Sequence, residues 1–211
     1  MKLGPSLPGF GSSTPASPSE QLELLGWCFR RESGQVFTLD EQLGYWVMRM
    51  AVAARLAYQP PPPIKPGDFN EKAKSLVFFD RGTTQAYGYS SEGYRCLVFR
   101  GSQQPIDFAV DGAVWLVGYP ARHFGFELGW KKVRSEIEDW LKDGAEPKRP
   151  LLLAGHSLGG ALAILAAYHL SEHYPIAGVI TFGGPRVGAA CFAEEYAKRT
   201  SPTGRPLGKV T

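Results

Sequence analysis

The stretch Pro150-Leu-Leu-Leu-Ala-Gly-His-Ser-Leu-Gly-Gly-Ala161 decides how this chain folds. Its first half is a short run of apolar residues, which predicts a strand buried on both faces of a sheet. The glycine-rich half leads into residues 161–173, whose composition predicts a helix. A strand that passes straight into a helix must turn sharply. The pattern Gly-x-Ser-x-Gly places Ser157 at the centre of that turn.

The two glycines that flank Ser157 have a steric reason to be there. Side chains at Gly155 and Gly159 would collide with the neighbouring strand and helix. Ser157 is thereby held above the edge of the sheet, at the N-terminus of the following helix. Free N–H groups and a positive partial charge at that helix end favour developing negative charge. The arrangement predicts a nucleophilic serine; the alternative is a tight turn whose serine only caps the helix.

Further elements extend this strand–helix unit in both directions along the chain. Upstream, strands are expected at residues 76–80, 84–90 and 94–100, and an amphipathic helix at 126–141. Downstream, a strand is expected at 176–182 and a helix at 189–198. The segment Ser91-Glu92-Gly93 is typical of a hairpin turn between two of these strands. Apolar strands alternating with helices predict an α/β fold, with a mostly parallel sheet and helices on both faces.

The first part of the chain has a different composition. Residues 1–20 contain twelve Gly, Pro or Ser, which predicts a flexible tail. A helix is expected to start after a capping box formed by Thr38 and Glu41 and to stop before Pro60. A proline-rich linker over residues 60–66 follows it. We therefore expect a tail over 1–20 and one partial α/β domain over 21–211 that contains the linker.

Overall composition excludes several classes of protein. The 211 residues carry a net charge of +3, which gives no support to nucleic-acid binding. Three widely spaced cysteines match neither a metal site nor a disulfide framework, so we expect no metal and no cofactor. The longest apolar run, residues 161–168, is too short for a transmembrane segment. No signal peptide is visible, so the compartment stays unknown, cytoplasmic by default.

Four motifs, in order, give the chain a family resemblance. They are Val98-Phe99-Arg100-Gly101-Ser102, His123-Phe124-Gly125-Phe126, Gly155-His156-Ser157-Leu158-Gly159-Gly160 and Thr181-Phe182-Gly183-Gly184-Pro185-Arg186-Val187-Gly188. Over residues 43–188 the chain resembles the class 3 lipases, the fungal-lipase-type branch of the α/β-hydrolase fold. One motif alone would be weak evidence, but four in register are specific.

The resemblance implies roles for individual residues. Ser157 matches the nucleophile that attacks an ester carbonyl. Ser102 matches the residue that supplies one oxyanion N–H, often with its hydroxyl, and Leu158 would supply the second N–H. Gly155 and Gly159 match the structural glycines of the turn. Each oxyanion donor is worth roughly 3–4 kcal/mol of transition-state stabilisation in hydrolases where it has been measured.

The segment after Ser102 aligns with the lid region of the family and includes Asp107, Phe108, Asp111 and Trp115. The apolar residues 113–117 predict shielding of the pocket or a transient contact with a lipid interface; the alternative is a plain surface loop. The substrate implied by the resemblance is an ester or acylglycerol lipid.

None of the four histidines is expected to serve as the general base. The resemblance makes His123 a hydrogen-bonded core residue. His156 is adjacent to Ser157, and adjacent side chains in this turn point in different directions. His169 and His173 share one helix face and are expected to be solvated, because a metal pair would need a third ligand.

The catalytic pattern is incomplete after Ser157. In this fold the chain order is Ser, then Asp or Glu, then His. No Asp follows Ser157 and no His follows His173, so no catalytic Asp or His is found in this chain. We expect a C-terminally incomplete domain that lacks the last strands; a degenerate hydrolase and a triad completed by another chain are the alternatives.

These observations lead to one preferred function. We expect a lipase- or carboxylesterase-type serine hydrolase that acts through an acyl-serine intermediate and is inactive or nearly so as this chain. The alternative is a non-catalytic lipid- or partner-binding pseudo-hydrolase.

Overall fold

The computed structural model describes residues 41–59, 64–69, 73–91, 93–102, 116–143, 149–199, 202 and 207. The chain divides into two units, Met1–Met48 and Arg49–Thr211. Of the first unit, the structure describes the beginning of helix α2 (Glu41–Leu56); the following paragraphs concern the second unit. The predicted tail, Thr38, the prolines of 60–63 and most of the predicted lid region (103–115) lie outside the described residues.

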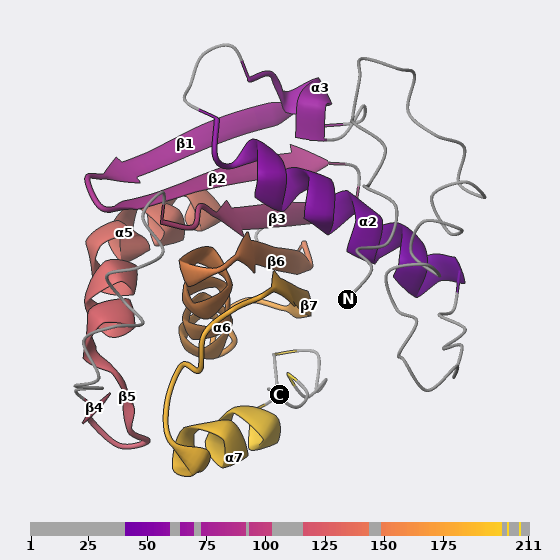
Figure 1. Ribbon diagram of the computed structural model, residues 1–211. Coiled ribbons are helices and arrows are strands. Elements are labelled where there is room, and N and C mark those ends of the chain that lie inside the picture. Colours follow the sequence, from indigo (N-terminus) through magenta and orange to yellow (C-terminus); the bar gives the residue numbers. More distant parts are fainter. Residues whose placement is uncertain are drawn as a thin grey trace, which may run out of the picture. The chain divides into compact units, whose positions relative to one another are not determined.

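The second unit is built around a five-stranded sheet in the order β1-β2-β3-β6-β7 (Figure 1). The strands span Ser75–Arg81 (β1), Thr84–Ser91 (β2), Tyr94–Phe99 (β3), Leu151–His156 (β6) and Ile176–Phe182 (β7). Strand β2 is antiparallel to both its neighbours, whereas β3, β6 and β7 pair in parallel. Four of the five strands therefore run in one direction.

The predicted α/β fold is confirmed, with one correction to the sheet. Two of its four strand pairings are antiparallel, because short turns join β1 to β2 and β2 to β3, and such turns permit only antiparallel neighbours. Gly82 and Gly93 lie in these turns with φ angles of 67° and 80°, which glycine adopts without strain. The mixed sheet keeps β3 and β6 adjacent and parallel.

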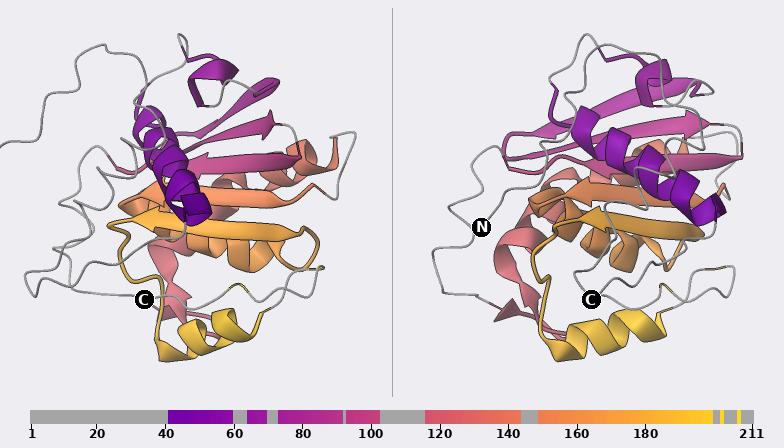
Figure 2. Two further views of the ribbon diagram at one scale, coloured as in Figure 1. Left: turned by 90° about the vertical axis from the view of Figure 1, so that its right-hand side faces the viewer. Right: turned by 45° about the vertical axis from the view of Figure 1, so that its right-hand side comes forward.

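Helices cover both faces of the sheet, as predicted. Helices α5 (Phe124–Lys142) and α6 (Leu158–Leu170) lie on one face (Figure 2), where Trp130 and Ile137 join Leu97 and Leu153 in the main core. On the other face, Met50 of α2 contacts Cys96 at 3.6 Å between sulfurs. The short helix α3 (Pro66–Phe69) places its buried Phe69 against two tyrosines of β2.

Three further elements complete the described residues. Strands β4 (Leu116–Val117) and β5 (Arg122–His123) form a two-residue ribbon, and α7 (Ala190–Lys198) follows β7. Neither the ribbon nor α3 was predicted, because segments of two to four residues are too short to show a hydrophobic period. Within the described residues, no helix is long and apolar enough to cross a membrane.

Candidate active site

Ser157 occupies the turn between β6 and α6. Its backbone has φ 54° and ψ −127°, and it is the only non-glycine residue with a positive φ in the described part of the chain. Such a conformation costs on the order of 1–3 kcal/mol and persists only where the surroundings enforce it. Part of the enforcement comes from β7, because the Ser157 N–H donates to the Phe182 carbonyl at 2.9 Å.

The glycines on either side of Ser157 allow the chain to pack closely there. A Cβ atom at Gly155 would lie 2.7 Å from the Gly160 nitrogen and would collide with the Gly159 carbonyl. A Cβ atom at Gly159 would lie 2.9 Å from the Arg100 carbonyl carbon and would collide with the Phe99 oxygen. Both positions therefore require glycine, one against α6 and the other against the end of β3.

The Ser157 side chain does not cap the following helix. Ser157 is the N-cap residue of α6, yet its hydroxyl makes no capping hydrogen bond. The alternative interpretation of Ser157 as a simple helix cap is therefore wrong. The side chain is partly exposed and lines a cavity of about 550 Å³.

Ser102 reaches the same cavity from the neighbouring strand. Strands β3 and β6 are paired up to Phe99 and Gly155, so the residues after each strand emerge at the same edge of the sheet. Ser102 and Ser157 both line the cavity, whose other lining residues include Ala51, Ala54 and Phe182. This edge of the sheet thus brings two serine residues to a cavity with largely apolar walls.

Leu158 is the first residue of α6, and its N–H belongs to the first turn, where backbone donors have no partner within the helix. It lines a second cavity of about 570 Å³ together with Ser102, Arg100 and Lys132. Ser102 therefore lies at the border of an apolar cavity and a more polar one.

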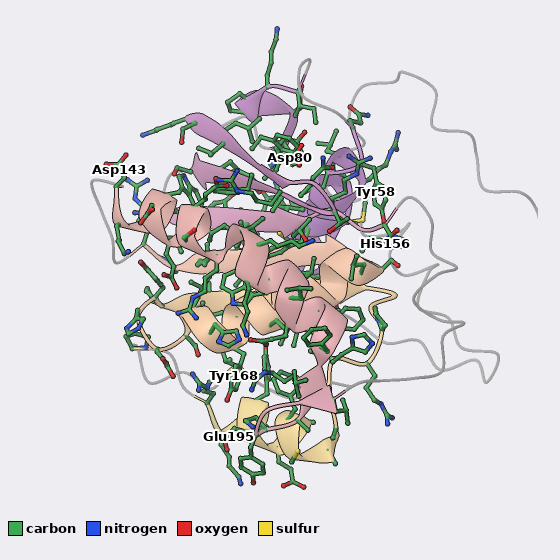
Figure 3. All side chains as sticks on the ribbon, turned by 90° about the vertical axis from the view of Figure 1, so that its left-hand side faces the viewer. Tyr58, Asp80, Asp143, His156, Tyr168 and Glu195 are labelled. Atoms are coloured by element: carbon green, nitrogen blue, oxygen red, sulfur yellow. The ribbon has the colours of Figure 1, made fainter. Side chains whose placement is uncertain are left out.

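Tyr58 is a member of the site that the sequence analysis missed. Its hydroxyl lies 2.8 Å from Nδ1 of His156, and the two rings meet edge to face with centroids 5.8 Å apart (Figure 3). Tyr58 also lines the apolar cavity. Burial raises the pKa of Tyr58, an effect that the Arg100 guanidinium partly offsets, so its hydroxyl stays protonated at neutral pH.

Two of the other three histidines differ from the predictions. His123 stacks on Phe126 with centroids 4.1 Å apart, and its buried Nδ1 has no hydrogen-bond partner among the described residues. Burial lowers the pKa of His123. His169 is mostly buried: it stacks on Trp130 and lies 3.3 Å from a carboxylate oxygen of Glu127. Only His173 is exposed as predicted.

Glu127 of α5 is the centre of a mostly buried polar cluster that also contains Arg122 of β5 and His169 of α6. Its carboxylate is 3.0 Å from Nε of Arg122 and 3.3 Å from Nε2 of His169, and its side chain is 7% exposed. Burial by itself would raise the pKa of Glu127, but His169 and Arg122 outweigh it and lower the pKa to about 2. No group of three or more His, Cys, Asp or Glu side chains suited to a metal ion occurs among the described residues.

Comparison with known proteins places this geometry in a family. Residues 96–204, slightly more than half of the chain, match the family Lipase (class 3). The chain belongs to the class 3 lipase family. The matched segment contains Ser102 and Ser157, the two serines that share the apolar cavity.

Individual class 3 lipase relatives cover the chain only in part. The secreted mono- and diacylglycerol lipase A of Penicillium cyclopium is 34% identical over 133 residues, which are 57% of this chain and 43% of that protein. The chloroplastic phospholipase A(1) DAD1 of Arabidopsis thaliana is 41% identical over 70 residues, 32% of this chain and 16% of that protein. The chain therefore spans less than half the length of these relatives.

Solved lipase structures share the fold. A lipase from Rhizopus microsporus var. chinensis superimposes with a TM-score of 0.64 and 22% identity, covering 78% of this chain and 65% of that one. The Rhizomucor miehei lipase propeptide complex gives a TM-score of 0.62 at 24% identity, covering 78% and 60%. These likenesses establish the α/β-hydrolase fold of this class 3 lipase chain.

Proposed function

We propose that this chain carries the nucleophile and the oxyanion hole of a serine hydrolase that cleaves carboxylic esters of acylglycerol-like lipids. The observation that carries the proposal is the meeting of Ser157 and Ser102 in one apolar cavity, at the ends of adjacent parallel strands. Two features of Ser157 support a chemical role. Its backbone is strained, and such strain is common at functional sites. Its hydroxyl makes no capping hydrogen bond to α6.

The chemistry follows from the positions of these groups. The Ser157 oxygen attacks the ester carbonyl and forms a tetrahedral oxyanion, while the hydroxyl proton passes to a general base. The N–H groups of Ser102 and Leu158 donate to the oxyanion. The intermediate then expels the alcohol, which takes up a proton, and leaves an acyl group on Ser157. Water releases the acid and restores the serine. No step needs a metal or an organic cofactor.

The general base is the group that the chain does not supply in the usual order. No Asp follows Ser157 and no His follows His173 in the 211 residues. Nδ1 of His156 is hydrogen-bonded to the hydroxyl of Tyr58. We therefore propose that the 211-residue chain by itself turns over esters very slowly, since the oxyanion hole and binding alone give only roughly 10³–10⁴-fold acceleration over water in a serine hydrolase.

The proposed substrate class comes from the cavity and from the relatives. The walls formed by Ala51, Ala54 and Phe182 are apolar and suit an acyl chain. The names of two relatives point to acylglycerol and phospholipid esters respectively. A contact with the surface of lipid aggregates belongs to the same proposal.

The test uses an external base to replace the missing one. The chain is incubated with a fluorophosphonate in the presence of imidazole, and the modified residue is located by mass spectrometry. We expect one adduct on Ser157, none in Ser157→Ala, and unchanged labelling in Ser135→Ala, whose serine is exposed on α5. Hydrolysis of p-nitrophenyl butyrate, after subtraction of the rate with imidazole alone, should likewise be lost in Ser157→Ala and unchanged in Ser135→Ala.

Two outcomes would contradict this proposal. The first is an adduct that still forms in Ser157→Ala. The second is the absence of any adduct on the wild-type chain at saturating imidazole. Either result would show that Ser157 is not the nucleophile. The apolar cavity would also suit a second candidate, a non-catalytic lipid-binding module. Displacement of a fluorescent fatty acid from a chain that is never labelled would identify that second function.

A further inference from the structure

We infer that Tyr58 is a positioning residue that fixes the two oxyanion-donating loops relative to each other. The inference rests on the proposed function, because it concerns the same oxyanion hole. The first loop is residues 100–102, which follow β3 and contain Ser102. The second is the turn over residues 156–158, from the last residue of β6 to the first residue of α6, and it contains Ser157.

The geometry around Tyr58 joins these loops at one point. Its hydroxyl lies 2.8 Å from Nδ1 of His156, in the second loop. The same hydroxyl occupies the space that a Cβ atom of Gly101 would need in the first loop, and that Cβ atom would also lie 2.6 Å from the His156 carbonyl oxygen. Figure 3 shows Tyr58 and His156 side by side. One phenol therefore contacts both loops.

Tyr58 adds a side-chain link at a point beyond the end of the β3–β6 pairing. The ladder between β3 and β6 stops at Phe99 and Gly155, so it does not fix the residues that follow. The Ser102 N–H comes one residue after Gly101, and the Leu158 N–H comes two residues after His156. Oxyanion stabilisation requires both donors within about 2.7–3.1 Å of one oxygen atom, so the separation of the loops controls the rate.

The backbone of Tyr58 and of the next residue is held by hydrogen bonds to neighbouring elements. Its backbone N–H donates to the Arg55 carbonyl at 3.2 Å, and Ala57 is fully buried. The next residue, Gln59, accepts a hydrogen bond at 2.9 Å from the hydroxyl of Tyr87 on β2. This second tyrosine anchors the same segment from β2 through a hydroxyl bond to Gln59 rather than to His156, and it provides a matched control.

The experiment compares Tyr58→Phe with Tyr87→Phe. Each change removes one hydroxyl hydrogen bond from the segment 58–59. The rate constant of Ser157 phosphonylation and the inhibitor's dissociation constant are measured separately, with imidazole as the base. We expect Tyr58→Phe to lower the rate constant roughly 10-fold with an unchanged dissociation constant, since small misplacements at a reacting centre are costly. Tyr87→Phe should change both values less than about twofold.

A second variant tests the hydrogen bond from its other end. His156→Ala should lower the rate constant as Tyr58→Phe does, and the double variant should be no slower than the slower single one, because both remove one interaction. Fully additive losses would overturn the inference, and so would a Tyr58→Phe rate equal to wild type. In both cases labelling of wild-type Ser157 would leave the proposed function standing.

Amide NMR decides the inference if wild-type Ser157 is not labelled at all, an outcome that defeats the proposed function. Tyr58→Phe should then still shift the amide resonances of Ser102 and Leu158 more than Tyr87→Phe does. Unshifted resonances would show that Tyr58 does not couple the loops.

Discussion

Replacing Glu127 by Gln should destabilise the fold strongly and in a pH-dependent way. Glutamine keeps the size of the side chain but turns a buried carboxylate that faces Arg122 and His169 into an amide. The pKa of Glu127 falls from the ordinary 4.5 to about 2 in the folded chain. At about 1.4 kcal/mol per pKa unit, this difference corresponds to about 3 kcal/mol of stability at pH 7.

The sign of the pH dependence follows from the direction of that shift. Because the pKa is lower in the folded state, the stabilisation is complete above the ordinary pKa of 4.5 and is lost as the pH falls towards 2. The difference between wild type and Glu127→Gln should therefore shrink to roughly 1.4 kcal/mol at pH 3. Urea unfolding followed by tryptophan fluorescence at pH 7 and pH 3 measures both values.

A matched control separates this cluster from ordinary surface pairs. Glu138 pairs with Arg134 at 2.7 Å on the outer face of the same helix, where the arginine side chain is 44% exposed. Glu138→Gln should cost only about 0.3–0.5 kcal/mol. The reasoning would be refuted if Glu127→Gln cost no more than this control at pH 7, or if its cost were the same at pH 3.

Three further predictions test the backbone of the site and of the sheet. Ser157→Gly should raise the free energy of unfolding by about 1 kcal/mol by releasing strain, whereas Ser157→Ala should not; equal stabilities in chemical denaturation would contradict this. Gly159→Ala should lower stability by about 2 kcal/mol or more because its Cβ meets the backbone of β3, and an unchanged melting temperature would disprove the packing argument. Gly93→Ala should lower the free energy of unfolding by about 1 kcal/mol and Gly67→Ala by less, because both positions have open space but only Gly93 has a positive φ. Similar losses of stability in parallel thermal melts would rule this out.

Local sequence patterns predicted the long elements well, because hydrophobic period and turn residues act over short distances. The strands β1, β2, β3, β6 and β7 and the helices α5, α6 and α7 lie within a few residues of their predicted positions. The helix after Ser157 begins at Leu158, three residues earlier than residue 161, where it was expected. That difference matters for the site, because it puts Ser157 directly at the helix end.

Contacts between distant residues were beyond the reach of such patterns. Tyr58 and His156 are 98 residues apart, and nothing local marks either as a partner of the other. His169 and Glu127 are 42 residues apart, and helical spacing gave no sign that α5 covers the face that carries His169. Burial of a polar side chain depends on which element packs over it, and only the assembled fold supplies that information.

The strain at Ser157 explains why the site depends on the whole sheet rather than on the Gly-x-Ser-x-Gly motif alone. A turn with φ 54° would relax if its neighbours allowed it. The carbonyl of Phe182 on β7 holds the Ser157 N–H, and the close approach of Gly159 to the end of β3 prevents α6 from withdrawing. The motif makes the strained turn sterically possible, and the strands on both sides of β6 make it stable. The strained conformation of Ser157 is therefore a property of three adjacent parallel strands.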